Sequence, residues 1–584
     1  MASTVARRGW VWAVWAGAAC AAGPRPLAGG GAPGGLRVDV QVDAARPLGL
    51  LPRPWRYFGA DEPNYATTPN GRKLLGQLGA LAPGEMFFRA HNLLTTGDGT
   101  PALKWGSTNA YTEVGGKPRY DWTIVDGVFD ALLERGVKPL VEIGFMPEAL
   151  SASPAPYRHH WPDTFFTGWT YPPRNYEAWQ ELVYQWVKHC VDKYGEREAQ
   201  SWWWETWNEP NIGYFSGSPE EFSRLNDHAL AGVRRALPRA RVGGPHTAGD
   251  GGEFMDRFLE HALHEQNYAT GERGTPLDYL AFHAKGKPES VGGHMRMGIQ
   301  NQLSTVDAAF ARFARYPELS GKPVIIGESD PEGCAACTGE GFDYRNGTVY
   351  ASYTAASFPR LLELAERHGT ALEGAVTWAF TFDRQPYFAG FRQVASNGLP
   401  LAVFNVFRMF SQLGRERLAA VSSGAQPLGD ILEHGIRAEA DIGVLASRSE
   451  RGVAVLVWNY HDDVVPAPDA QVALTVSGLP RSATRVPLAH YRVDERHGDV
   501  FSAWRRLGSP PAPNPEQYAA LERASELAVL DGSPEATAVG DGRATLEFSL
   551  PRHAVSLVVL GEPALAGRPP AAGAASTPSP AVTR

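Results

Sequence analysis

Residues 202–211 read WWWETWNEPN, a short apolar run that leads directly into polar residues with two glutamates among them. Runs of this length are typical of buried strands. Seven other segments have the same form and also end in polar or glycine-rich residues. Together with this one, they span residues 55–59, 86–90, 139–143, 201–206, 241–243, 277–282, 323–327 and 374–378. The repetition predicts eight buried strands.

Helical patterns separate these strands. Residues 121–135, 175–194 and 357–368 carry apolar side chains at 3.6-residue spacing. Ser218, with Glu221 three residues later, forms a capping-box pattern that predicts the start of another helix. Strand and helix alternating eight times predict an α/β fold, a (β/α)8 TIM barrel with long loops. A doubly wound open sheet is the alternative, but no glycine-rich phosphate loop follows the first predicted strand.

The pattern changes after about residue 415, where short strands alternate with Gly, Pro and Asp clusters. These strands are predicted at residues 453–458, 472–476, 488–493, 544–550 and 555–560. Their spacing predicts a C-terminal antiparallel β-sandwich accessory domain. Apolar and polar residues alternate over residues 36–43, which predicts a strand that precedes the barrel and joins the sandwich as an edge.

The N-terminus has the form of a secretory signal peptide. Arg7 and Arg8 precede an apolar stretch, residues 9–22, with small residues at Ala19 and Ala21. We expect cleavage near residues 21–23 and a secreted protein, periplasmic or extracellular. The alternative is a chain start without a targeting role.

The chain is thus expected to have six parts. They are a signal peptide at residues 1–22, a disordered linker at 23–35, a strand joining the sandwich at 36–50, the barrel at 51–414, the β-sandwich at 415–562 and a disordered tail at 563–584.

Composition excludes several classes of function. The 584 residues include 55 Lys and Arg against 63 Asp and Glu, a net charge of −8. Such a chain does not favour nucleic acid as a partner, and no basic run is present that would bind anionic lipid. Beyond the N-terminus no apolar run reaches the length of a membrane span. Four cysteines are too few for a disulfide scaffold. Oligomeric state is not indicated.

Two glutamates occupy matched positions at strand ends. Glu209 follows the fourth predicted strand, and Glu328 follows the seventh. In a barrel these strands end on opposite sides of the mouth, so the two carboxyls can face each other across a sugar ring. Glycoside cleavage uses such a pair, one carboxyl donating a proton and the other attacking or activating water. A salt bridge or a helix cap is the alternative for either glutamate alone.

Several motifs together resemble glycoside hydrolase family 39, the family of β-xylosidases and α-L-iduronidase, over roughly residues 50–410. The motifs are FRAH at 88–91, EIGFMP at 142–147, YPPRNYEAW at 171–179 and WETWNEPN at 204–211. The resemblance implies a (β/α)8 barrel, a β-sandwich and net retention of anomeric configuration. By position it implies that Glu209 is the general acid/base and Glu328 the nucleophile. Because like charges so close push one pKa up, we expect Glu209 to be protonated near neutral pH.

Other strand-end residues are candidates for substrate binding. Asn208 resembles the residue that hydrogen-bonds the sugar 2-hydroxyl, and His283 is expected to orient Glu328. His91 and Arg89 are expected to bind ring hydroxyls or to keep the nucleophile ionised. The alternatives are a buried cap of the strand end for Asn208, a satisfied core histidine for His283 and a structural ion pair for Arg89. Phe145 and Trp378 are expected to form apolar walls of the sugar pocket, with core packing as the alternative. His246, Lys285 and Asp383 are further candidates for contact with the substrate, and no motif supports them.

The chain also departs from the family. Many members have an aromatic residue and Tyr after the histidine of the sixth strand, where this chain reads HAKG at 283–286. Lys285 brings a positive charge that could select an acidic sugar or pair with Asp330 or Glu332. Cys334 and Cys337 follow the nucleophile and could form a strained disulfide or remain free thiols. No cofactor or metal is expected, because two carboxyls and water suffice.

The sequence therefore predicts a secreted retaining glycoside hydrolase on an oligosaccharide or polysaccharide, exo-acting on plant-type glycans, with a β-xyloside as the default substrate. An α-L-arabinoside, β-galactoside, uronide or exopolysaccharide remains open, as does endo action. A non-catalytic glycan-binding protein is the alternative class, and it would be expected to have lost one of the two glutamates.

Overall fold

The computed structural model describes residues 36–157 and 168–562. The predicted signal peptide, linker and C-terminal tail lie outside these ranges. Within them, no helix is both long enough and apolar enough to cross a lipid bilayer.

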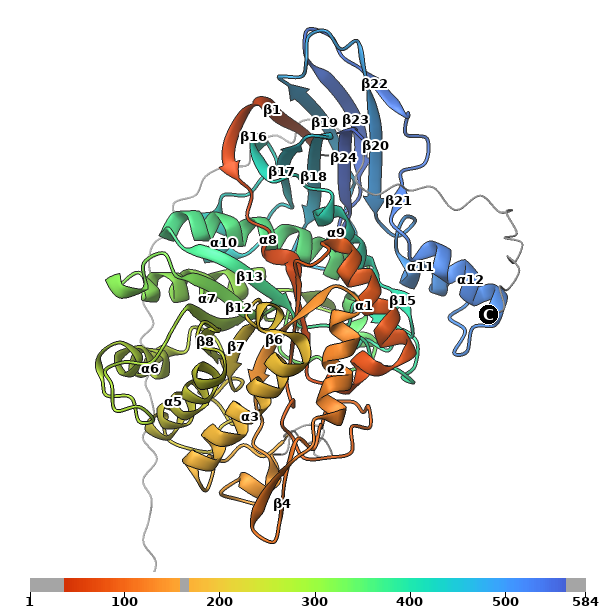
Figure 1. Ribbon diagram of the computed structural model, residues 1–584. Coiled ribbons are helices and arrows are strands. Elements are labelled where there is room, and N and C mark those ends of the chain that lie inside the picture. Colours follow the sequence, from red (N-terminus) through yellow and green to blue (C-terminus); the bar gives the residue numbers. More distant parts are fainter. Residues whose placement is uncertain (1–35, 158–167, 563–584) are drawn as a thin grey trace, which may run out of the picture. The chain divides into compact units, whose positions relative to one another are not determined.

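Eight parallel strands close into a barrel (Figure 1). In order around the barrel they are β12 (Pro323–Asp330), β13 (Ala371–Thr377), β2 (Tyr57–Ala60), β3 (Met86–Ala90), β6 (Val137–Ile143), β7 (Trp203–Thr206), β8 (Arg241–Thr247) and β9 (Tyr279–Lys285). The (β/α)8 prediction is confirmed. The alternative of an open sheet is wrong, because β9 pairs with β12 and closes the ring.

Helices follow the barrel strands along the chain. They are α1 (Pro69–Leu81), α2 (Thr123–Leu133), α3 (Tyr176–Tyr194), α4 (Glu196–Ala199), α5 (Pro219–Ala236), α6 (Gly252–His264), α7 (Ile299–Phe313), α8 (Thr348–His368) and α9 (Ala402–Ser411). The predicted capping box at Ser218 is confirmed, since the Ser218 and Glu221 side chains each accept from the other's backbone N–H. Short strands lie in the loops: β4 (Tyr111–Val114), β5 (Lys117–Tyr120), β10 (Glu289–Val291), β11 (His294–Arg296), β14 (Ala395–Ser396) and β15 (Leu399–Pro400).

Helix α8 is longer than its apolar stripe predicts. It begins at Thr348, nine residues before the pattern that starts at residue 357. The added turns carry mainly small residues, Ala, Ser and Thr, which are buried although they form no Leu-type stripe. Small side chains let a helix approach its neighbours closely, so burial here does not depend on the apolar periodicity that sequence reading detects.

The barrel interior is filled by side chains from its strands. Tyr57 stacks on Phe87 at 4.9 Å between ring centroids, and Trp203 packs edge-on against Tyr279 at 5.0 Å. The cluster also includes Leu140, Ala281, Ile325, Val376 and Trp378. A packed interior leaves the loops at the carboxyl ends of the strands as the place for a site.

The remaining strands form a second sheet around its own core. They are β1 (Arg37–Leu50), β16 (Glu416–Ser422), β17 (Asp441–Ser449), β18 (Gly452–Tyr460), β19 (Ala470–Ser477), β20 (Arg485–Val493), β21 (Ala528–Val529), β22 (Ala536–Ala538), β23 (Ala544–Leu550) and β24 (Val555–Gly561). The helices α10 (Leu428–His434), α11 (Val500–Arg506) and α12 (Pro515–Ala524) lie between them in sequence. Apolar side chains from β1, β17, β18, β19 and β24 share one core, as expected for a sandwich.

Strand β1 differs in one respect from the sequence expectation. It lies inside the sheet between β16 and β19, not at an edge, and its pairing with β19 is parallel. The sheet is therefore mixed. Because β1 precedes the whole barrel in the chain, no hairpin connects it to its neighbours, and nothing local imposes an antiparallel direction.

Candidate active site

The WETWNEPN segment forms a tight turn that presents Glu209. The Glu209 backbone N–H donates to the His246 carbonyl at 3.0 Å. The Asn211 side chain bonds Ala248 twice, donating to its carbonyl at 2.9 Å and accepting from its N–H at 2.8 Å. Glu209 itself has a left-handed backbone, with φ of 42°. Non-glycine residues rarely adopt this conformation, and where they do they often lie at functional sites.

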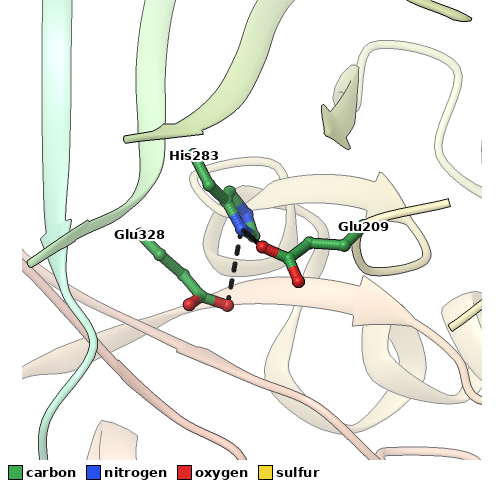
Figure 2. A group of neighbouring side chains, drawn as sticks. All are labelled: Glu209, His283 and Glu328. Carbon is green, nitrogen blue, oxygen red and sulfur yellow. Dashed lines mark hydrogen bonds and ion pairs between the residues drawn. The ribbon is translucent and has the colours of Figure 1, made fainter. Parts of the chain in front are cut away.

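Glu209 and Glu328 are close neighbours in three dimensions (Figure 2). One carboxylate oxygen of each lies within 4.8 Å of the other, and both side chains are more than nine-tenths buried. Glu328 lies in β12, and Gly327 precedes it. A Cβ at Gly327 would lie 2.0 Å from the His246 ring, so the glycine lets this histidine pack against the strand.

His283, two residues before the end of β9, reaches both carboxylates. Its Nδ1 is 2.9 Å from Glu209 Oε1 and 3.5 Å from Glu328 Oε1 (Figure 2). The expectation that it orients Glu328 by a hydrogen bond is therefore corrected, because the hydrogen bond goes to Glu209. The strands β9 and β12 place the backbones of His283 and Glu328 side by side, and the ring projects past Glu328 toward the Glu209 turn.

Lys285 connects the same two carboxylates. Its Nζ lies 2.7 Å from Glu328 Oε2 and 3.3 Å from Glu209 Oε1. One fifth of its side chain remains exposed, more than that of either glutamate. The suggested pairing of Lys285 with Asp330 or Glu332 is wrong. Both acids form ion pairs with the buried Arg392 instead, at 3.6 Å for Asp330 and 3.0 Å for Glu332.

Arg89 and Asn208 form a buried layer beneath the carboxylates. Arg89 donates from Nε to Glu205 Oε1 at 2.6 Å and from Nη2 to Asn208 Oδ1 at 3.2 Å. Its Nη2 lies 2.9 Å from Glu142 Oε2, and its Nη1 lies 3.6 Å from Glu328 Oε1. Arg89 is fully buried, and its guanidinium contacts the carboxylates of Glu142, Glu205 and Glu328. Of its predicted roles, the structure fits the ion pair and the stabilisation of an ionised Glu328.

His91 lies between Arg89 and the aromatic candidates. Its Nε2 is 3.7 Å from Glu328 Oε1, and its ring lies 4.3 Å from Trp378 and 5.8 Å from Phe145, centroid to centroid. Trp378 and Phe145 are almost completely buried. They therefore pack behind His91 and do not present exposed walls.

The remaining two candidates, His246 and Asp383, lie in different surroundings. His246 is fully buried in close contact with the Glu205 carboxylate, and burial lowers the pKa of His246 to about 4. Asp383 accepts a hydrogen bond from Asn70 of α1 at 2.9 Å.

Electrostatics of the site overturn one expectation. Burial would raise the pKa of Glu209, but the Lys285 cation and the hydrogen bond from His283 outweigh it and lower this pKa to about 2. The pKa of Glu328 also stays well below its ordinary value, because Lys285, His283 and His91 outweigh burial. Glu209 is thus ionised at neutral pH in the free site, contrary to the sequence expectation. The reason is that the lysine offsets the repulsion between the two carboxylates.

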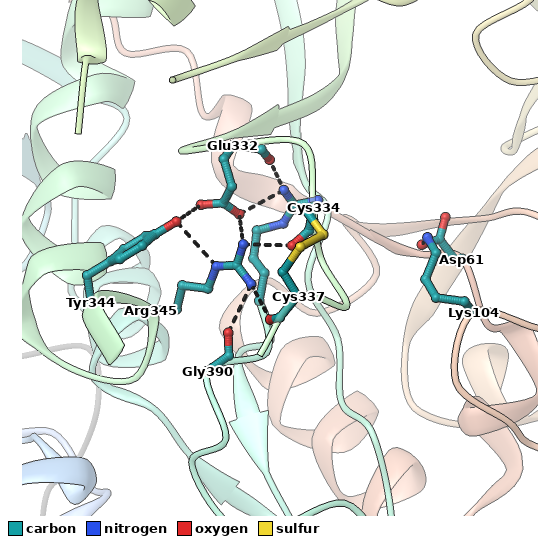
Figure 3. Close-up of a disulfide and its surroundings, with 9 residues drawn as sticks. Asp61, Lys104, Glu332, Cys334, Cys337, Tyr344, Arg345 and Gly390 are labelled. Atoms are coloured by element: carbon teal, nitrogen blue, oxygen red, sulfur yellow. Dashed lines mark hydrogen bonds and ion pairs between the residues drawn. A yellow bond between two sulfur atoms is a disulfide. The ribbon is translucent and has the colours of Figure 1, made fainter. Parts of the chain in front are cut away.

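The cysteine pair after the nucleophile strand is bonded. Cys334 and Cys337 form a disulfide (Figure 3). Arg345 holds the bonded loop, donating from Nη2 to the Cys334 carbonyl at 2.6 Å and from Nη1 to the Cys337 carbonyl at 2.9 Å. Glu332, from the same loop, pairs with Arg345 at 3.2 Å. The loop that follows Glu328 is therefore held by both covalent and ionic contacts.

Sequence reasoning missed four charged residues of this region. Glu142 and Glu205 lie within quoted motifs, and an acid inside an apolar strand is a signal that it has a buried partner. Burial raises the pKa of Glu142 to about 7 although His91 and Arg89 oppose it. The other two, Asp61 and Lys104, carry no such signal, because they meet only through the path of a loop.

Among the residues that the structure describes, one group of side chains has metal-ligand spacing. A ring nitrogen of His283 and one oxygen each of Glu209 and Glu328 lie within 4.8 Å of one another. Lys285 already approaches both carboxylates, so its ammonium supplies a positive charge at this place.

Comparison with known proteins decides the family. The model of the family "Glycosyl hydrolases family 39" matches residues 38–539. The chain belongs to this family. It is a glycoside hydrolase, and its substrate is a glycan. This family 39 hydrolase is 24% identical to a β-xylosidase of Caldicellulosiruptor saccharolyticus over 423 residues, 69% of this chain and 76% of that one.

Two further comparisons extend to the second domain. An α-L-iduronidase of Homo sapiens is 27% identical over 570 residues, 89% of this family 39 hydrolase and 78% of that protein. The solved structure described as the bacterial orthologue of human α-L-iduronidase superposes with a TM-score of 0.73, covering 92% of this chain and 85% of that one at 21% identity. The structural likeness supports the barrel and the sandwich.

Proposed function

We propose that the enzyme cleaves its glycan by double displacement with retention, Glu209 acting as acid/base and Glu328 as nucleophile. The supporting observation is the 4.8 Å limit between their carboxylate oxygens. Retaining enzymes hold the two carboxyls about 5–5.5 Å apart, whereas inverting enzymes leave about 6.5–9.5 Å for a water. A separation below 4.8 Å between one oxygen of each carboxylate supports the retaining arrangement.

The two steps use the same two side chains. In the first, a Glu328 oxygen bonds to the anomeric carbon while Glu209 gives its proton to the departing glycosidic oxygen. In the second, Glu209 takes a proton from water, the water oxygen bonds to the anomeric carbon, and the Glu328 ester bond breaks. Arg89 and His91 lie beside the Glu328 oxygen and stabilise its negative charge when it departs.

The low pKa of Glu209 in the free site raises the question of how it acquires a proton. Lys285 is the main cause of that low pKa. A substrate that draws the ammonium toward itself would let the pKa of Glu209 rise, as the mechanism needs. A sugar carboxylate does so most effectively, because a charged acceptor forms the stronger hydrogen bond.

We therefore propose a uronic acid as the glycone, bound through Lys285 and released by exo action. The partly exposed position of Lys285 supports it. So does the similarity to α-L-iduronidase, which extends over 89% of the chain. A β-xyloside, favoured by the sequence, is the second candidate, supported by the similarity to β-xylosidases.

Aryl glycosides that differ only in the sugar test this choice. The panel would contain the α-L-iduronide, β-glucuronide, β-xyloside, α-L-arabinoside and β-galactoside, with proton NMR of the first-formed anomer. For a uronide we expect Lys285→Met to lower kcat/KM by about 10- to 100-fold, since a charge-assisted hydrogen bond is lost. A wild-type preference for the xyloside, with Lys285→Met affecting all sugars equally, would support the second candidate.

The pH profile provides an independent prediction about Lys285. Loss of a proton from Glu209 ends activity on the basic side, and the lysine keeps the pKa of Glu209 low. Removing the cation raises that pKa, so in Lys285→Met the basic limb of kcat/KM moves to higher pH, by about one unit or more. The substrate should be an alkyl glycoside, because its alcohol leaves only when Glu209 protonates the glycosidic oxygen. Lys287→Met, which removes an exposed lysine two residues away, is the control. An unmoved basic limb in Lys285→Met would refute this role.

Secretion is also a proposal, carried by residues 1–22. Sequencing the N-terminus of the exported protein tests it, with a start near residues 21–23 expected.

A further inference from the structure

A charged pair lies on the wall of the site and is not used by the mechanism above. Asp61 directly follows β2, and Lys104 lies in the loop after β3. The Lys104 ammonium forms a close ion pair with the Asp61 carboxylate (Figure 3). Asp61 Oδ1 also lies 2.8 Å from His91 Nδ1. Since the opposite ring nitrogen of His91 approaches Glu328, the pair is two contacts from the nucleophile.

The pair lies close to the catalytic glutamates, because the His91 ring contacts both Asp61 and Glu328. The Asp61 and Lys104 side chains are 9% and 12% exposed, which matches Glu209 at 8% and Glu328 at 4%. Burial lowers the pKa of Lys104 to about 7, and the charges of Glu328 and Glu209 oppose this shift.

The strand that precedes the Lys104 loop lies opposite the strand that carries Lys285, whereas Asp61 follows β2, which β13 and β12 separate from β9. Three strands separate β3 from β9 in either direction around the ring. Lys285 ends β9, whereas Lys104 is carried by the loop after β3. A sugar that lies between Glu209 and Glu328 with Lys285 on one side would thus have the Lys104 loop on the other.

The loop does not need the ammonium to keep its path. The Lys104 backbone N–H donates to Glu62 Oε1 at 2.7 Å. Asn64 and Ser107 exchange two hydrogen bonds of 2.9 Å, again between a side chain and a backbone. Lys104 nevertheless has a left-handed backbone with φ of 55°, a conformation unfavourable for a residue with a Cβ. A glycine would adopt this backbone conformation with less steric strain. The chain nevertheless has a lysine here, and its side chain contacts Asp61.

We propose that Asp61 and Lys104 together bind two adjacent hydroxyl groups of the glycone and so determine which sugars the enzyme accepts. The carboxylate accepts from one hydroxyl, and the ammonium donates to the oxygen of its neighbour. Such a pair requires both hydroxyls to be free and correctly oriented, which selects a terminal sugar of one configuration. This inference rests on the proposed function, because it assumes that the sugar lies between Glu209 and Glu328.

Monodeoxy substrates test the proposal. The parent aryl glycoside and its 2-, 3- and 4-deoxy analogues are compared in the wild type, Asp61→Asn and Lys104→Met. In the wild type we expect kcat/KM to fall about 10- to 100-fold when a bound hydroxyl is missing. In each variant the penalty for one of two adjacent positions should shrink to within about threefold, because the partner of that hydroxyl is gone.

A control and a second variant keep the test decisive. The control is Glu62→Gln, at the acid next to Asp61. Glu62 accepts a hydrogen bond from the Lys104 backbone N–H and so helps to hold the same loop. This variant should leave all deoxy penalties as in the wild type. Lys104→Gln replaces Lys104→Met if the latter lowers the melting temperature. Deoxy penalties equal to those of the wild type in both Asp61 and Lys104 variants would show that the pair is only structural. A failure of the proposed function would look different, since Glu328→Ala would then remain active.

Discussion

Replacing Glu328 by alanine is expected to lower turnover by at least about 10⁴-fold, because the proposed covalent step needs its carboxylate to bond to the anomeric carbon. The carboxylate lies within 4.8 Å of Glu209 and is kept ionised by Lys285, His283 and His91. Removing it leaves the acid, the lysine and the pocket in place but takes away the covalent intermediate. The measurement is kcat on an activated aryl glycoside, with the melting temperature as a check on folding.

Added azide distinguishes loss of the nucleophile from general damage. In Glu328→Ala, azide can enter the space left by the carboxylate and attack from that face, which gives a glycosyl azide of inverted configuration. Restoration of the original anomer by azide would contradict the assignment, and so would an alanine variant that keeps more than a small fraction of activity. Glu328→Gln, which preserves shape, should be nearly as inactive.

The second large effect is expected for Glu209→Ala, and it should depend on the leaving group. Proton donation typically contributes about 10²- to 10⁴-fold to such reactions. An alkyl glycoside, whose oxygen must be protonated as it departs, should lose this full factor in the first step. The dinitrophenolate of a dinitrophenyl glycoside leaves as a stable anion without a proton. With this substrate the variant should form the glycosyl-enzyme intermediate at close to the wild-type rate.

The same variant should respond to azide in the opposite stereochemical sense. Without Glu209 the second step lacks a base for water, but azide needs none and attacks the glycosyl-enzyme on the face that Glu209 occupied. The product should be a glycosyl azide of retained configuration. Equal losses for good and poor leaving groups, with no rescue by azide, would rule out the acid/base role.

The strands and the positions of both acids were predictable from sequence for a physical reason. Each barrel strand is a short apolar run because it is buried on both faces, and its end is polar because a site opens there. Glu209 and Glu328 stand out because an acid after such a run is otherwise costly. These features are local, so one sequence suffices to find them.

The electrostatics of the site depend on contacts that no local pattern encodes. His283 and Glu328 are paired on adjacent strands, yet the His283 ring bonds Glu209. Lys285 was expected to meet acids near it in the next loop and instead spans the two glutamates. The resulting fall in the pKa of Glu209 could be seen only once these atoms were in place.

The pair of Asp61 and Lys104 illustrates the same limit. Asp61 directly follows the first barrel strand, and Lys104 lies 43 residues later in a loop with neither apolar periodicity nor a motif. Their meeting depends on hydrogen bonds between Glu62, Asn64 and the loop backbone. Long-range loop contacts of this kind have no signature in a single sequence.

Trapping the covalent intermediate tests the central claim most directly. A 2-deoxy-2-fluoro glycoside of the preferred sugar, with an activated leaving group, should inactivate the enzyme by forming an ester that hydrolyses slowly. After proteolysis, mass spectrometry should find one added glycosyl group, located on Glu328 within the sequence PVIIGESD at 323–330. A glycosyl group on Glu209 or on another residue would contradict the assignment. Hydrolysis with inversion and no labelled peptide would contradict double displacement itself.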